Sequence, residues 1–125
     1  MIEHKNRSVS LLLGLEAIKL LAQTAEACSA FVLDRGYDEA MIKLSLHCSD
    51  RSEHIAQYLS EATDESWPLK SVLDDLAWLD NFRAITEPLR TESGRHVPSV
   101  EETEKLRSKI MTFLSLRTEQ PTGVF

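Results

Sequence analysis

Glycine and proline are scarce in this chain of 125 residues, which has only four of each. An average protein has about 7% glycine. β-Sandwiches and β-barrels need a turn every ~8–12 residues, and glycine and proline form many of those turns. The shortage therefore excludes most all-β folds and predicts a few long helices.

Cysteine and long apolar runs are also scarce. The two cysteines, Cys28 and Cys48, are too few for a secreted disulfide scaffold or a cysteine-based zinc site. Unbroken runs of large apolar residues, such as 11–13, are no longer than three residues, so the sequence predicts no transmembrane span. The polar opening, 1–8, leads into a patterned helix without a small-residue cleavage site, which predicts no signal peptide. We therefore expect a cytoplasmic protein that does not act at a membrane.

Positive charge is in the minority, and the formal net charge is −6. An acidic chain repels phosphate backbones, so broad nucleic-acid binding is not expected. Residues 37–66 contain seven acids and two bases, which places most of the excess negative charge on one predicted helix and the loop after it. The sequence contains no P-loop, no glycine-rich dinucleotide turn and no HExxH motif, so no cofactor is predicted.

Apolar periodicity and capping signals predict four helices. Ser8 or Ser10 can cap the first helix, and Gly36 can end it in a left-handed conformation. Asp38 is suited to begin the second helix, and Pro88 is expected to end or kink the third. The predicted ranges are 8–35, 38–62, 67–88 and 99–118.

The fourth helix has the clearest start, because Ser99 and Glu102 have the spacing of a capping box. Four helices with short connections favour an all-α, antiparallel up-down-up-down bundle. We expect one domain over 1–119 and a mobile tail over 120–125.

Apolar side chains are in excess on two of the predicted helices. They cover more than half of the first helix, which is typical of a central helix or of one side of an oligomer interface. The third helix has a second apolar stripe at 4-3-4 spacing. Large aromatic residues at such a stripe contribute strongly to binding. The predicted interaction residues are Leu12, Leu13, Leu20, Trp78, Phe82, Ile85 and Leu89.

A polar row on the second helix offers a different function. His47, Asp50, His54, Gln57 and Glu61 follow 3-4-3-4 spacing and project from one helix face. Asp50 and His54 can share a metal ion, but His47 and His54 are two turns, roughly 10 Å, apart along the axis. The row is therefore interpreted as a solvated face with an Asp–His pair. A metal site or helical-bundle enzyme using His47, Asp50, His54 and Glu61 is the alternative.

Two further pairs have ordinary interpretations as well. Cys28 and Cys48 occupy apolar positions on adjacent helices, where cysteine acts as a small buried hydrophobic residue. Arg90 and His96 stand a few residues apart in the order Arg-then-His, which resembles a pair used by some HEPN-type ribonucleases, themselves helical bundles. That family holds its pair near a helix, whereas Gly94 and its neighbours predict a loop here, so we interpret the segment as a connector with two exposed cations.

The most strongly predicted function is a non-enzymatic protein–protein interaction module, such as a small chaperone, adaptor, antitoxin, immunity protein or inhibitor. We expect it to dimerise and to bind a basic partner steered by the acidic second helix. The third hypothesis is a DNA-binding regulator that uses the basic residues of the fourth helix, although glutamates offset much of their charge. Those basic residues are Lys105, Arg107, Lys109 and Arg117.

Overall fold

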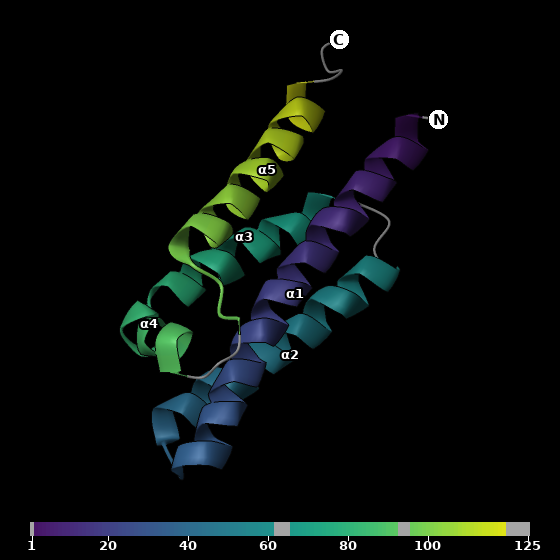
Figure 1. Cartoon of the computed structure of the whole chain (residues 1–125). Coiled ribbons are helices and arrows are strands. Elements are labelled where there is room, and N and C mark those ends of the chain that lie inside the picture. The colour runs from purple at the N-terminus through teal and green to yellow at the C-terminus, as the bar shows by residue number, and fades with distance from the viewer. Residues whose placement is uncertain (1, 62–65, 93–95, 120–125) are drawn as a thin grey trace.

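The computed structural model describes residues 2–61, 66–92 and 96–119, and it contains helices and no strand within those ranges (Figure 1). The all-α class predicted from the sequence is therefore confirmed. The predicted number of helices is wrong, because the expected third helix is two separate helices. The five helices are α1 (Ile2–Arg35), α2 (Glu39–Glu61), α3 (Ser66–Asp80), α4 (Arg83–Glu92) and α5 (Val100–Glu119).

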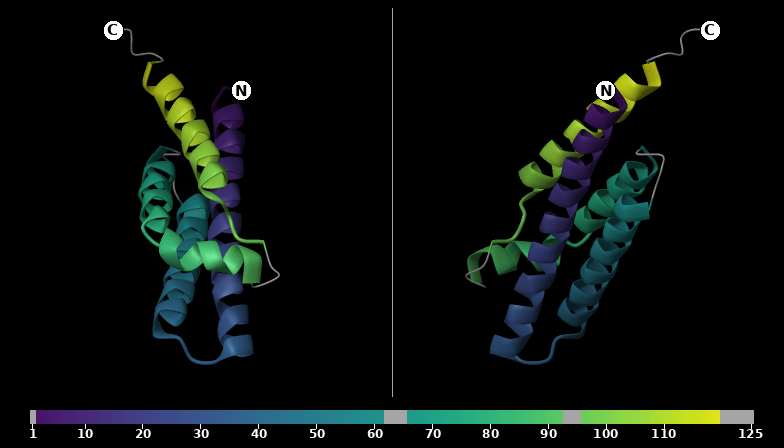
Figure 2. Two further views of the ribbon diagram at one scale, coloured as in Figure 1. Left: turned by 60° about the vertical axis from the view of Figure 1, so that its left-hand side comes forward. Right: turned by 90° about the vertical axis from the view of Figure 1, so that its right-hand side faces the viewer.

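A short turn folds α2 back along α1 (Figures 1 and 2). Gly36 has a φ of 102°, and its N–H donates to the carbonyl of Val32 at 2.8 Å, which ends α1 as predicted. The Asp38 carboxylate then accepts a hydrogen bond from the N–H of Met41 at 3.1 Å and caps α2. These two local signals position the hairpin.

The start of α1 differs from the prediction. The helix begins at Ile2, six residues before the expected cap at Ser8. Ser10 is buried within the helix, so neither serine marks its first turn. Residues 2–7 contain no proline or glycine, and nothing in them interrupts the helix.

The chain changes direction between α3 and α4. The N–H groups of Asn81 and Phe82 donate to carbonyls only three residues back, both at 3.0 Å, which tightens and ends the helix. The Arg83 side chain then donates to Asp80 at 2.7 Å and to the Pro98 carbonyl at 2.9 Å. Pro88 lies inside α4, so the prediction that the helix ends at this proline is wrong, whereas the predicted kink stays a prediction.

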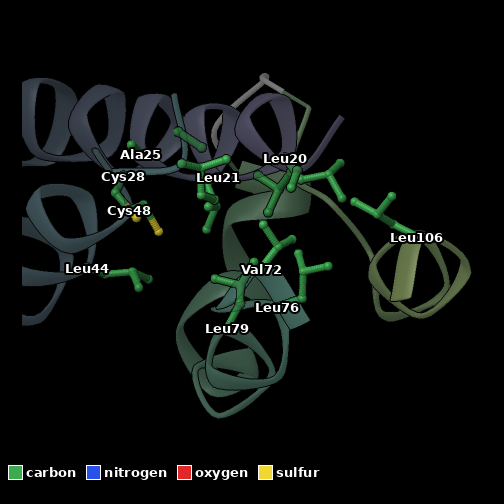
Figure 3. Close-up of a cluster of buried hydrophobic side chains, with 14 of the residues drawn as sticks. Leu20, Leu21, Ala25, Cys28, Leu44, Cys48, Val72, Leu76, Leu79 and Leu106 are labelled. Carbon is green, nitrogen blue, oxygen red and sulfur yellow. The ribbon is translucent and has the colours of Figure 1, made fainter. Parts of the chain in front are cut away.

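α1 is the central helix, because it contacts each of the other four. The core draws side chains from all five helices, among them Leu21, Ile55, Leu76, Leu89 and Leu106, which are almost completely buried. In Figure 3 Leu20 of α1 points toward α3 and α5, whereas Cys28 lies beside Cys48 of α2. Much of the apolar excess of the first helix is therefore used within the fold.

The contact between α1 and α2 is close and is lined by small residues. A Cβ added to Gly14 would lie 2.6 Å from Leu59 Cδ1, so only glycine fits there without a shift of Leu59. Further along the same contact, the Ser45 hydroxyl donates to the Ala25 carbonyl at 3.0 Å and lies 2.9 Å from the Ser29 hydroxyl. Small residues on both helices thus allow α1 and α2 to approach closely.

Residues Ser8–Arg35 of α1 are long and apolar enough to cross a membrane, judged by length and composition alone. The sequence prediction relied on unbroken apolar runs, which are short, whereas the average over the whole helix is apolar. Of the most apolar stretch, 44% is buried within the protein. The core helix of a soluble protein and a signal sequence meet the same criterion, so this finding does not assign a location.

Candidate interaction surfaces

The predicted interaction residues of α1 divide between surface and core. Leu12 is 66% exposed. Leu13 and Leu20 are buried, and Figure 3 shows Leu20 among the core side chains of α3 and α5. The assignment of Leu20 to a binding surface is wrong, because packing of α3 and α5 against α1 covers it, whereas Leu13 lines a groove between α1 and α5.

The predicted stripe on α3 and α4 is also largely internal. Leu89 is completely buried, while Trp78, Phe82 and Ile85 are half-buried and pack against the core. The Trp78 ring lies 4.0 Å from the ring of His47 and 4.5 Å from that of Phe82, measured between centroids. Much of this stripe therefore contacts the protein itself.

A different row of side chains leaves apolar surface exposed on α1. We call Leu11, Leu15, Ala22, Ser29 and Leu33 the outer stripe, because their 4-7-7-4 spacing places them on one side of the helix. Leu15 is 55% exposed and Leu33 is 88% exposed. Ser29 lies at the edge of this row that borders α2, where its hydroxyl is 2.9 Å from the Ser45 hydroxyl. The sequence did not single out this row, because apolar residues surround most of α1.

The outer stripe continues onto α2 at the hairpin end. A cavity of about 310 Å³ lies between the last turns of α1 and the first turns of α2. Leu46, at its edge, is 65% exposed. The hairpin end therefore presents apolar surface from two helices. The cavity is lined by Cys28, Ser29, Val32, Leu33, Met41, Ile42, Ser45 and Leu46.

A second apolar surface, the α1–α5 groove, lies near the other end of α1. It has a volume of about 670 Å³, and Val9, Leu13, Phe113 and Leu116 supply its apolar wall. Lys109 also lines the groove, and its ammonium is 3.7 Å from the Glu16 carboxylate of α1. The remaining lining residues are Lys105, Ser108 and Thr112.

The polar row of α2 separates into unconnected contacts. His54 Nδ1 lies 2.9 Å from the Asp50 carbonyl and 3.5 Å from its carboxylate, and the Gln57 amide donates to Glu61 at 3.5 Å. His47 instead stacks on Trp78. Among the residues that the structure describes, no group of three or more histidine, cysteine or acidic side chains is placed to hold a metal ion.

Both cysteines lie in the core between α1 and α2 (Figure 3). Burial raises the pKa of Cys28 to about 11 and that of Cys48 to about 12. A nucleophilic or metal-binding cysteine must be a thiolate. The thiols are therefore protonated near neutral pH and fill core volume.

A charge pair that the sequence did not predict joins α2 to α3. The Arg51 guanidinium donates to both carboxylate oxygens of Asp75, at 2.8 and 3.2 Å, and to Ser71 at 3.2 Å. Burial raises the pKa of Asp75, although the hydrogen bond and charge of Arg51 oppose that rise. The arrangement holds two helices together.

Arg90 and His96 do not form a site. Arg90 lies in α4 rather than in the predicted loop, and it pairs with Glu87 of the same helix at 3.1 Å. His96 Nε2 lies 3.0 Å from Glu102 at the start of α5. Arg90 and His96 therefore each have a separate carboxylate partner.

Two of the basic residues of α5 lie near carboxylates, whereas Lys105 is exposed. Arg107 lies 3.3 Å from Asp80 of α3, and Lys109 is near Glu16. The side chain of Arg117 lies outside the described residues. A helix that reads DNA needs its cations directed outward as a group, and these two are directed at neighbouring helices.

No protein-family model matches the sequence, and neither a known protein nor a solved structure is similar enough to count as a match.

Proposed function

We propose that this protein is a non-enzymatic interaction module that forms a dimer and binds a partner protein through apolar helix surfaces. One observation carries the proposal: after five helices have packed, Leu15, Leu33 and Leu46 are each more than half exposed along adjoining parts of α1 and α2. Single exposed leucines are ordinary, whereas apolar side chains gathered on one face are typical of protein-binding surfaces.

Charge supports a basic partner. Of the acidic residues on α2, Glu39, Asp50, Glu53 and Glu61 are exposed. Complementary charge speeds the encounter and selects the partner more than it adds affinity. We therefore propose that α2 steers a basic protein toward the apolar surface at the hairpin end.

The arrangement of the helices supports a bundle that associates with a second copy of itself. α1, α2, α3 and α5 are the longer helices, and we propose that they act as an antiparallel bundle with α4 as a crossing connection. A dimer then buries the outer side of α1, which in the monomer is the most exposed side of the central helix. A cytoplasmic location is part of the same proposal.

The metal hypothesis has less support. Among the candidate metal ligands of α2, His47 packs against the Trp78 ring. Asp50 and His54 then remain as a pair on a solvated face. The DNA hypothesis has less support because Arg107 and Lys109 lie near carboxylates. The test of the proposed function includes both alternatives.

Sedimentation velocity of the full chain over a range of concentrations tests self-association. We expect a dimer whose fraction rises with concentration, and we expect Leu33→Lys and Leu46→Lys to shift it to monomer with unchanged helicity by circular dichroism. Met111→Lys is the matched control, since Met111 is 58% exposed on α5 and lines neither surface. A monomer at every concentration contradicts the proposed dimer.

Two further measurements address the alternatives. Thermal unfolding with added Zn²⁺, Fe²⁺ or Mn²⁺ is expected to give the same melting temperature as without metal, because a metal that binds only the folded state raises it. Mixing with duplex DNA is expected to give no binding that weakens steeply with salt. A metal-dependent shift, or salt-dependent DNA binding, favours the corresponding alternative.

A further inference from the structure

We infer that the partner on the outer stripe is a second copy of this chain, paired through two antiparallel α1 helices with the two-fold axis beside Ala22. The inference rests on the proposed function, since it specifies the geometry of a self-association proposed there. Its basis is the order of residues along the exposed side of α1.

The outer stripe is symmetric about its own middle. Leu11 and Leu33 both lie 11 residues from Ala22, and Leu15 and Ser29 both lie seven residues from it. In a two-fold interface, residue i of one copy contacts residue j of the other, and residue j contacts residue i. Antiparallel pairing centred at Ala22 therefore brings Leu11 to Leu33 and Leu15 to Ser29, twice in each dimer.

Side-chain sizes suit this pairing. Ala22 is the smallest member of the outer stripe, and a small residue at the axis lets the two helices come close. Near each end, Leu33 adjoins Ile42 and Leu46 of α2. The pairing places Leu11 and Leu15 of one copy over this hairpin end of the other, so Leu33 is buried against leucine.

Charges beside the outer stripe have the matching order. Lys19 and Glu26 are exposed, and helical geometry puts both on the same flank of the stripe. Lys19 precedes Ala22 by three residues and Glu26 follows it by four. A two-fold axis between antiparallel helices brings each flank of one helix against the same flank of the other. Lys19 of one copy therefore lies opposite Glu26 of the other. In a parallel two-fold pair each flank faces the opposite flank of the other copy, so Lys19 and Glu26 would not meet.

Cysteine cross-linking tests the position of the axis. We expect Ala22→Cys to form an intermolecular disulfide rapidly under mild oxidation, because a residue at the axis faces its own copy. The control is Ala77→Cys, an exposed alanine on α3, which is expected to cross-link no faster than the wild type. The native thiols are buried and give a low background. A dimer in which Ala22→Cys cross-links no faster than Ala77→Cys overturns the inference.

Charge reversal tests the direction of the helices. Lys19→Glu alone and Glu26→Lys alone each place two like-charge contacts in the dimer, and we expect each to raise its dissociation constant about tenfold. The double variant restores opposite charges and is expected to return to within about threefold of wild type. Singles without effect, or a double variant weaker than either single, overturn the antiparallel register.

The possible results distinguish a failure of this dimer geometry from a failure of the proposed function. A protein that is monomeric at all concentrations contradicts the proposed dimer, whereas a dimer that fails both tests contradicts only this register. Flotation with vesicles of phosphatidylcholine and phosphatidylglycerol tests whether a membrane, instead of a second copy, binds the outer stripe. Binding of a monomer to these vesicles, lost in Leu15→Lys, would assign the outer stripe to a membrane and overturn the inference.

Discussion

Between α1 and α2, contact is made by small and apolar side chains, whereas α3, α4 and α5 are joined by charged and capping groups. Gly14 lies against Leu59, and both cysteines fill the same contact. At the other helices, Asp80 accepts from Arg83 and Arg107. Close packing depends on side-chain volume, and ion pairs depend on protonation and ionic strength. The two regions should therefore respond to different perturbations.

The largest expected effect contrasts the two sides of α1. Leu20→Asp places a charge in the core and should lower the free energy of unfolding by about 4 kcal/mol. Leu15→Asp, on the outer stripe, should change the stability of the monomer by no more than about 0.5 kcal/mol and weaken the dimer. Urea denaturation at a concentration where the chain is monomeric measures both. If Leu20→Asp and Leu15→Asp lower the free energy of unfolding equally, Leu15 belongs to the core and not to an exposed stripe.

The next effect tests the charged region. Asp75→Ala leaves the Arg51 guanidinium without its carboxylate in a site where the two side chains are only 21% and 10% exposed. We expect a loss of about 3 kcal/mol. Asp74→Ala is the matched control, because this neighbouring carboxylate is exposed and should cost less than about 0.5 kcal/mol. If the two variants lose the same stability, the pair does not hold α2 to α3.

A smaller effect is expected at the start of α5. The Ser99 hydroxyl accepts from the N–H of Glu102 at 3.2 Å, and the Glu102 carboxylate accepts from the N–H of Ser99 at 3.1 Å. Ser99→Ala should lower the free energy of unfolding by about 1 kcal/mol. Ser108→Ala, an exposed serine later in the same helix, serves as the control, and an unchanged melting temperature for Ser99→Ala would contradict the cap.

The smallest effect is a pH dependence confined to this capped region. Burial tends to raise the pKa of Glu102, but hydrogen bonds from His96 and Ser99 outweigh it and hold the pKa below its usual 4.5. A lowered pKa means that folding favours the carboxylate, so its contribution is full above pH 4.5 and is lost as the pH falls below that value. Glu102→Gln should remove this dependence, and the contribution should be below about 1 kcal/mol because the side chain is partly exposed.

Asp75 gives the opposite sign. Its raised pKa means that folding favours the protonated form, so it adds stability at low pH that decreases as the pH rises through its folded pKa. Comparison of unfolding curves for the wild type and Glu102→Gln between pH 3 and 7 isolates the Glu102 contribution, since Asp75 is common to both. An identical pH dependence in the two proteins would contradict the assignment.

Features that depend on near neighbours in sequence were predictable. Gly36, Asp38 and the pair of Ser99 and Glu102 mark helix ends through bonds within a few residues, and all are found as expected. These signals depend on residues close in sequence, so the packing of distant segments does not change them.

Features that depend on distant residues were missed. The break before Arg83 involves contacts with Pro98 and Thr103, which lie 15 and 20 residues away. The direction of Arg51 depends on Asp75, 24 residues away. The inner side of α1 could not be assigned, since apolar residues surround most of the helix and packing alone decides which are covered. This ambiguity placed Leu20 on the predicted binding surface.

The turn that joins α1 to α2 also bears on the order of folding. Only residues 36–38 separate the two helices, and closing so short a connection costs little chain entropy. The charged contact of Arg107 with Asp80 spans 27 residues and has to close a far longer loop. We expect the α1–α2 hairpin to form first and to act as the surface on which α3, α4 and α5 assemble.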